Sequence, residues 1–148
     1  MKGSFTKVTG HHTNFYPAEG DKTKQSVVMA IEEFLEQGVS KEEIFIGAAF
    51  YGRVWRGVNG DNNGLLQKAE TYGSETMSYR KLKSKCIEKQ EFKKFWDDNA
   101  KAPYLFDENT FIFYDDAHSV EEKMLFAGRI KLGGIMFWEY SYETFQIE

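Results

Sequence analysis

The spacing of apolar residues changes along the chain, and each change predicts a different kind of element. Residues 44–53 form an almost unbroken apolar run that ends in an aromatic residue, a glycine and a cation. A strand buried on both faces has this pattern, because a strand exposed on one face would alternate apolar and polar side chains. Residues 135–139 repeat the pattern and become polar after Trp138. The two runs predict a pair of buried parallel strands.

Helical spacing precedes each of these runs. Apolar side chains recur on one helical face of residues 27–35, and Gly38 follows as a residue suited to end a helix. A second apolar face runs through residues 119–130, where Ser119 and Glu122 have the form of a capping box. Helices that precede buried strands are typical of proteins that alternate helices and strands around a parallel sheet.

The segment between the two buried runs has another pattern. Residues 57–64 are rich in glycine and asparagine and predict a loop. Residues 92–96, 104–106 and 110–114 are short, aromatic and separated by acidic turns, which predicts antiparallel strands. Because a parallel crossover needs only about a dozen residues, we expect this segment to contain an inserted α+β module.

Three candidate binding residues lie where the buried runs end, namely Tyr51, Arg53 and Trp138. In α/β barrels, the C-terminal ends of the strands and the loops after them form the active-site face. Adjacent strands lie about 4.8 Å apart, so we expect these side chains to converge on one patch. The alternative is structural: Tyr51 caps an apolar layer, Arg53 is a solvated loop residue, and Trp138 packs in the core.

Composition narrows the range of partners. The 148 residues carry a formal net charge of -4, which favours neither nucleic acid nor an anionic membrane surface. No run approaches the roughly 20 apolar residues of a membrane span, and no signal peptide follows Met1. His11 and His12 are adjacent, which is not the spacing of a metal pair, so we expect no metal and no cofactor. The single Cys86 leaves the redox compartment open.

Linked motifs in this sequence resemble the C-terminal part of a family-18 glycoside hydrolase, the chitinase family. The resemblance covers nearly the whole chain and implies an α+β fold: the C-terminal portion of a (β/α)8 TIM barrel, with strands seven and eight, carrying an inserted chitinase insertion domain. The implied division is 1–56 for a barrel segment, 57–116 for the insertion domain and 117–148 for a second barrel segment. The matching stretches are 9–14 (Thr-Gly-His-His-Thr-Asn), 50–53 (Phe-Tyr-Gly-Arg), 133–139 (Gly-Gly-Ile-Met-Phe-Trp-Glu), 78–80, 102–104 and 114–116.

The resemblance implies a chitinase that cleaves β-1,4-linked N-acetylglucosamine polymers by substrate-assisted retaining hydrolysis. By this resemblance Trp138 is the floor of the subsite where the sugar ring distorts, and Tyr51 and Arg53 form its hydrogen-bonding wall. The family's Asp-x-x-Asp-x-Asp-x-Glu signature, which supplies the catalytic acid, does not occur in these 148 residues. We therefore expect the chain to be part of a longer protein, to contribute no catalytic residue, and to be inactive alone.

Two alternatives to a chitinase stay open at this point. One is a chitinase-like lectin that binds chito-oligosaccharides without cleaving them, and the other is a glycosidase of bacterial wall or spore glycan. The expected partners are chitin or N-acetylglucosamine oligosaccharides, and by resemblance the full-length protein is expected to be secreted or extracellular. The truncated barrel is expected to self-associate through uncovered apolar surface. Asp115 and Asp116 are expected to be turn and helix-entry residues rather than catalysts.

Overall fold

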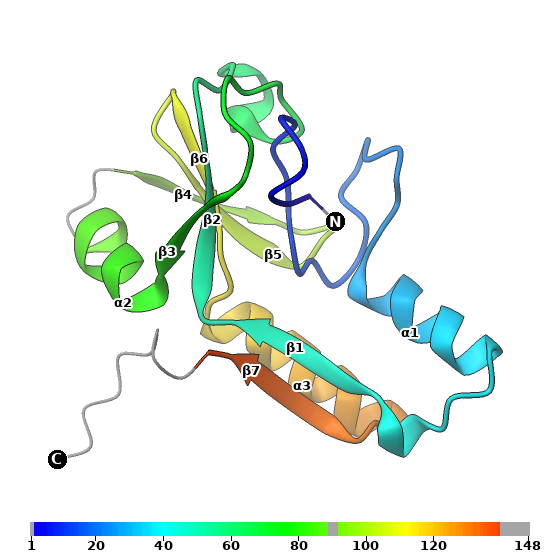
Figure 1. The fold of residues 1–148 in the computed structure, drawn as a ribbon. Coiled ribbons are helices and arrows are strands. Elements are labelled where there is room, and N and C mark those ends of the chain that lie inside the picture. The colour runs from blue at the N-terminus through cyan, green and yellow to red at the C-terminus, as the bar shows by residue number, and fades with distance from the viewer. Residues whose placement is uncertain (1, 89–91, 140–148) are drawn as a thin grey trace, which may run out of the picture.

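The computed structural model describes residues 2–88 and 92–139, and its strands in this part of the chain form two sheets (Figure 1). β1 (Phe45–Ala49) and β7 (Gly134–Trp138) pair in parallel. The second sheet is antiparallel and contains, in spatial order, β3 (Glu75–Ser78), β2 (Tyr51–Arg56), β6 (Thr110–Phe113), β5 (Ala102–Phe106) and β4 (Lys93–Asp97). The parallel pair and the three aromatic antiparallel strands expected from the sequence are confirmed.

The apolar run 44–53 is not one strand, and on this point the sequence prediction is wrong. β1 ends at Ala49, and a bend at Phe50 separates it from β2. The amide of Phe50 donates to the carbonyl of Trp138 at 2.9 Å, while the carbonyl of Phe50 accepts from the amide of Tyr79 at 3.0 Å. The chain thus leaves the parallel sheet at Phe50 and enters the antiparallel one, so β2, which was expected within the barrel segment, pairs with strands of the inserted segment.

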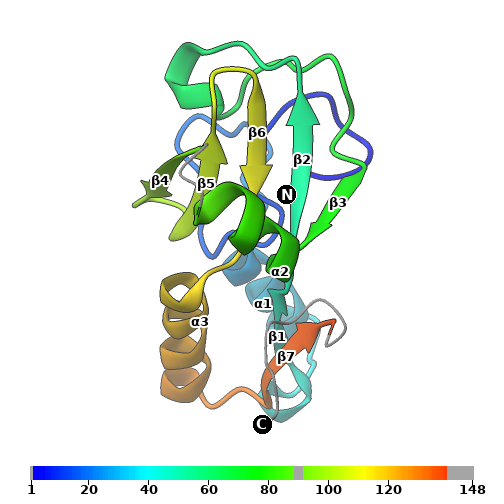
Figure 2. The same ribbon diagram turned by 90° about the vertical axis from the view of Figure 1, so that its left-hand side faces the viewer.

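Two helices cover one face of the parallel pair. They are α1 (Val27–Glu36), which follows the N-cap Ser26, and α3 (Ala117–Ile130). Figure 2 shows α3 to one side of β1 and β7. The cluster between the helices and the strands consists of Ile31, Ile44, Ile46 and Ala127, with Ile135 packed against it.

The opposite face of the parallel pair is apolar, and within residues 2–88 and 92–139 no helix or strand covers it. Its residues alternate with those that face the helices, as the two-residue period of a strand requires. The side chains of Phe45, Met136 and Trp138 are 57%, 44% and 60% exposed, and we call these three residues the open face. Exposed apolar surface of this kind marks a surface that other chain segments or partners cover.

The start of α3 also differs from the sequence prediction. Its N-cap is Asp116, whose side chain accepts from the amide of Ser119 at 2.9 Å, while the Ser119 hydroxyl accepts from the amide of Asp116 at 3.0 Å. The reciprocal capping box thus begins at Asp116, and the box predicted for Ser119 and Glu122 is wrong. The helix-entry role expected of Asp116 is confirmed.

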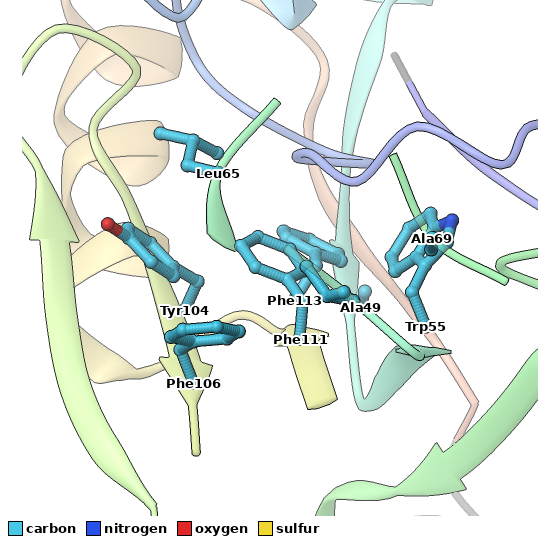
Figure 3. Close-up of a cluster of buried hydrophobic side chains, with 9 residues drawn as sticks. Ala49, Trp55, Leu65, Ala69, Tyr104, Phe106, Phe111 and Phe113 are labelled. Atoms are coloured by element: carbon cyan, nitrogen blue, oxygen red, sulfur yellow. The ribbon is translucent and has the colours of Figure 1, made fainter. Parts of the chain in front are cut away.

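The five-stranded sheet is buried on both faces. One face carries a cluster of large aromatic side chains (Figure 3), and the other packs against the short helix α2 (Tyr79–Leu82) through Leu82. The N-terminal loop closes the aromatic side, since the Trp55 indole donates to the Thr6 carbonyl at 3.0 Å. Single turns occur at Lys41–Glu43, Asp61–Gly64 and Lys83–Ile87. The aromatic cluster consists of Ala49, Trp55, Val58, Leu65, Ala69, Tyr104, Phe106, Phe111 and Phe113.

Candidate functional site

The C-terminal ends of β1 and β7 meet the start of β2, as Figure 1 shows. Ala49 and Trp138 are register partners at the last position of the parallel pair. Beyond them, the ring of Phe50 stacks on the ring of Phe137, with 5.0 Å between centroids and 13° between planes. The structure therefore brings the backbone positions of Trp138 and Tyr51 to one place in the fold, and it leaves the indole of Trp138 mostly exposed.

Arg53 and Tyr51 form a pair on β2. Residues two apart on a strand share a face, and the Arg53 guanidinium carbon lies 5.6 Å from the centre of the Tyr51 ring. The Nη1 group of Arg53 donates to the Gly73 carbonyl at 3.1 Å, whereas its buried Nε has no protein partner among the described residues. Arg53 is thus half-buried and fixed at one end rather than a solvated loop residue, and guanidinium donors remain for a ligand.

His12 joins this pair, which the sequence analysis did not foresee. Its ring centroid lies 6.2 Å from that of Tyr51 and 6.2 Å from that of Phe113. The Nδ1 atom of His12 lies 3.0 Å from the carbonyl oxygen of Lys2, which can only accept, so Nδ1 carries the hydrogen in this contact. Burial, and after it the nearby charge of Arg53, lower the pKa of His12 below 6.5.

The neighbouring His11 points to a different partner. Its Nε2 atom lies 3.1 Å from the Oδ2 atom of Asp97, and both side chains are almost fully buried. Within residues 2–88 and 92–139, no group of three or more histidine, cysteine or acidic side chains is arranged to hold a metal ion. The same residues contain no helix that is both long and apolar enough to cross a membrane.

Asp115 is the centre of a buried polar network at the end of β1. One of its carboxylate oxygens accepts from the Ala49 amide at 2.9 Å and from the Thr13 hydroxyl at 2.8 Å, and the other accepts from the Ser119 hydroxyl at 2.8 Å. The Nζ atom of Lys123 lies 2.7 and 2.8 Å from the two oxygens. The network joins β1, the N-terminal loop and α3, so Asp115 is a buried structural residue rather than a simple turn residue.

The sequence contained one signal for this network. Lys123 lies on the apolar face of α3, three residues after Val120 and four before Ala127, and a lysine at such a position needs a buried partner. Its side chain has no solvent exposure. The identity of the partner depends on the fold, because Asp115 precedes the helix and reaches Lys123 only once α3 has packed.

Comparison with known proteins gives the family. The sequence model described as "Glycosyl hydrolases family 18" matches residues 1–143. Chitinase A1 of Niallia circulans is 32% identical over 156 residues, which cover 95% of this chain and 22% of that protein. Chitinase B of Serratia marcescens is 28% identical, with coverage of 89% of this chain and 31% of that protein. The chain thus spans only a minor part of the length of these relatives.

A solved structure of high similarity agrees with this result. The structure of a glycoside hydrolase family 18 N-acetylglucosaminidase from Paenibacillus barengoltzii superposes with a TM-score of 0.93 at 43% sequence identity. The superposition covers 97% of this chain and 42% of that one. The mixed helices and strands described above are therefore those of a family-18 fold. The resemblance seen in the sequence motifs is confirmed, and the chain belongs to glycoside hydrolase family 18.

Proposed function

We propose that the chain is the C-terminal part of a chitinase-type glycoside hydrolase and that β1 and β7 are strands seven and eight of its (β/α)8 barrel. The support is their parallel pairing, the helix α3 that precedes β7, and the covering of a single face by helices. In such a barrel, helices lie outside the strands and side chains fill the interior. The open face then points toward the barrel interior, and residues 57–116 form the insertion domain, whose sheet β2 completes.

The intact protein then hydrolyses β-1,4-linked N-acetylglucosamine polymers by the substrate-assisted retaining route. The acetamido oxygen of the sugar attacks its own anomeric carbon, while a glutamic acid outside these 148 residues protonates the leaving oxygen. This chain supplies binding residues: the exposed indole of Trp138 faces the sugar ring, and Tyr51 and Arg53 donate hydrogen bonds to it. One observation carries the assignment, namely the register of Ala49 with Trp138 at the strand ends.

Turnover of a chromogenic chitobioside tests the activity. We expect the full-length protein to release product and residues 1–148 alone to release none, because positioned proton transfer is worth about 10² to 10⁴-fold and its acid is outside this chain. Turnover by residues 1–148 would contradict the assignment. Oligosaccharide binding without turnover by the full-length protein would indicate a lectin, and release from peptidoglycan but not from chitin would indicate a wall glycan glycosidase.

Two substitutions in the full-length protein test the binding residues. Trp138→Phe keeps most of the volume and is expected to lower turnover, while Arg53→Lys is expected mainly to weaken binding, since lysine lacks the planar guanidinium fork. Trp96→Phe is the matched control. Trp96 lies on β4, an edge strand of the five-stranded sheet that β6 and β5 separate from β2, and its ring stacks on that of His118 with 4.0 Å between centroids. If both site variants match the control in turnover and affinity at an unchanged melting temperature, these residues only pack.

We further propose that the full-length protein acts outside the cell. A polymer such as chitin is insoluble and cannot be degraded unless the enzyme reaches it. The net charge of -4 agrees with a neutral polysaccharide partner rather than with nucleic acid. Secretion is tested by measuring chitobioside turnover in culture supernatant and in washed cells, and activity confined to the cells would contradict it.

A further inference from the structure

His12 lies beside Tyr51, one residue of the proposed hydrogen-bonding wall, and Arg53, the other residue of that wall, lies on the same Tyr51 ring. Its ring packs at 6.2 Å from the Tyr51 ring on one side and from the Phe113 ring on another, and the guanidinium of Arg53 lies beside Tyr51. The Nδ1–H group of His12 donates a hydrogen bond to the Lys2 carbonyl. The imidazole is therefore held in one orientation by a hydrogen bond at one nitrogen and by two aromatic rings.

Burial, and after it the charge of Arg53, disfavour a proton on the other nitrogen of His12. Arg53 approaches from β2, and its positive charge opposes a second one on the imidazole. Asp115 follows β6 and is the negative group that would favour a proton, but its carboxylate is already engaged by Lys123. From the N-terminal loop, Lys2 presents its carbonyl, which favours a proton, and β2 also presents the Tyr51 phenol.

Arg53 is free to respond to such a charge. Its guanidinium donates one hydrogen bond, to the Gly73 carbonyl, and lies against the Tyr51 ring, while its Nε has no hydrogen-bond partner among the described residues. A guanidinium held by a single hydrogen bond can turn away from a new positive neighbour by rotating its side chain. That rotation moves its donors away from the Tyr51 ring.

We propose that the uncharged imidazole of His12 positions Tyr51 and Arg53 for sugar binding, and that a proton on His12 weakens binding by displacing the Arg53 guanidinium. This inference rests on the proposed function for its ligand, a β-1,4-linked N-acetylglucosamine oligosaccharide. His12 is a positioning residue, since it acts through Arg53 and Tyr51. If only the unprotonated form binds, the apparent dissociation constant rises up to about tenfold for each pH unit below the pKa of His12.

The first test compares KM and kcat for a chromogenic chitobioside between pH 4.5 and 8 in the full-length protein and in His12→Asn. The asparagine amide can still donate to the Lys2 carbonyl but takes up no proton. We expect KM of the unaltered protein to rise at acid pH and KM of His12→Asn to stay flat. The control is His118→Asn, whose histidine side chain is 58% exposed on α3, and it should keep the acid rise.

A second measurement needs neither turnover nor a variant. Nuclear magnetic resonance of the full-length protein can follow the Arg53 Nε–H signal and the His12 ring signals through the same pH range. We expect the Arg53 signal to move with the midpoint of His12. An Arg53 signal that ignores the His12 titration, or an acid rise in KM that survives in His12→Asn, overturns the inference. If Arg53 follows His12 but no sugar binds at any pH, the proposed function is wrong while the coupling between the two residues stands.

Discussion

Replacing Lys123 with methionine tests whether the buried network at the end of β1 holds the two sheets and α3 together. Methionine keeps the length and apolar stem of the side chain but removes the ammonium group. The substitution leaves the Asp115 carboxylate with three donors, from Ala49, Thr13 and Ser119, and no counter-charge. Both side chains of the ion pair are nearly inaccessible to water, at 0% and 2% exposure, so water cannot replace the lost partner.

The expected loss is large for one substitution. Breaking a buried ion pair by removing one partner costs about 3–5 kcal/mol, because the remaining charge stays buried and uncompensated. A domain of this size is stable by about 5–15 kcal/mol, so Lys123→Met should remove a large fraction of the free energy of unfolding. A loss of about 4 kcal/mol lowers the unfolding midpoint by at most about 2 M, the value for a urea m-value of about 2 kcal/mol/M, because m rises with protein size.

Urea unfolding of the full-length protein, followed by tryptophan fluorescence, measures this shift. The matched control is Lys93→Met, because Lys93 pairs with Glu108 at 3.8 Å with both side chains over 70% exposed. Exposed pairs contribute about 0–1 kcal/mol, so the control should barely move the midpoint. If Lys123→Met and Lys93→Met shift the midpoint equally, the buried network stabilises the fold no more than an exposed ion pair does.

Three further predictions concern stability and association. Burial raises the pKa of Asp97, but hydrogen bonds from His11 and two backbone amides outweigh burial and hold this pKa below 3.8. The ionised Asp97 therefore stabilises the fold above that pH. Asp97→Asn should therefore cost about 1.5–3 kcal/mol at pH 7, and this difference should shrink in urea titrations as pH falls below 3.8. A methyl group at Gly73 would collide with the Trp55 ring, so Gly73→Ala should cost about 1–3 kcal/mol in unfolding free energy, whereas Gly60→Ala, with open space around it, should not. Residues 1–148 alone should sediment as oligomers through the open face, and a monomer at high concentration would contradict this.

Much of the fold could be predicted because buried positions are apolar and recur with the period of the helix or strand that carries them. The two apolar runs correctly indicated the parallel strands, and the aromatic segments indicated antiparallel ones. The bend at Phe50 could not be predicted from the hydrophobic pattern, because the residues on both sides of it are apolar. Ile46 packs against helices, whereas Val54 and Trp55 are buried against the second sheet. A change of sheet without a change of polarity is invisible to a pattern of hydrophobicity.

The site was partly predictable for a similar reason. The two-residue spacing of Tyr51 and Arg53 correctly placed them together, since strand geometry alone decides that contact. The position of His12 beside Tyr51 could not be predicted, because it depends on how an irregular loop packs against β2. The capping of α3 was missed by three residues, since both Asp116 and Ser119 are good N-cap residues and only tertiary packing selects between them.

A crystal structure of the full-length protein with a bound N-acetylglucosamine oligosaccharide tests the central claim most directly. The account predicts that β1 and β7 are adjacent strands of a closed barrel, with one sugar ring against the indole of Trp138 and hydrogen bonds from Tyr51 and Arg53. A sugar bound elsewhere, with the Trp138 indole covered by other strands of the protein, would contradict the assignment of this site.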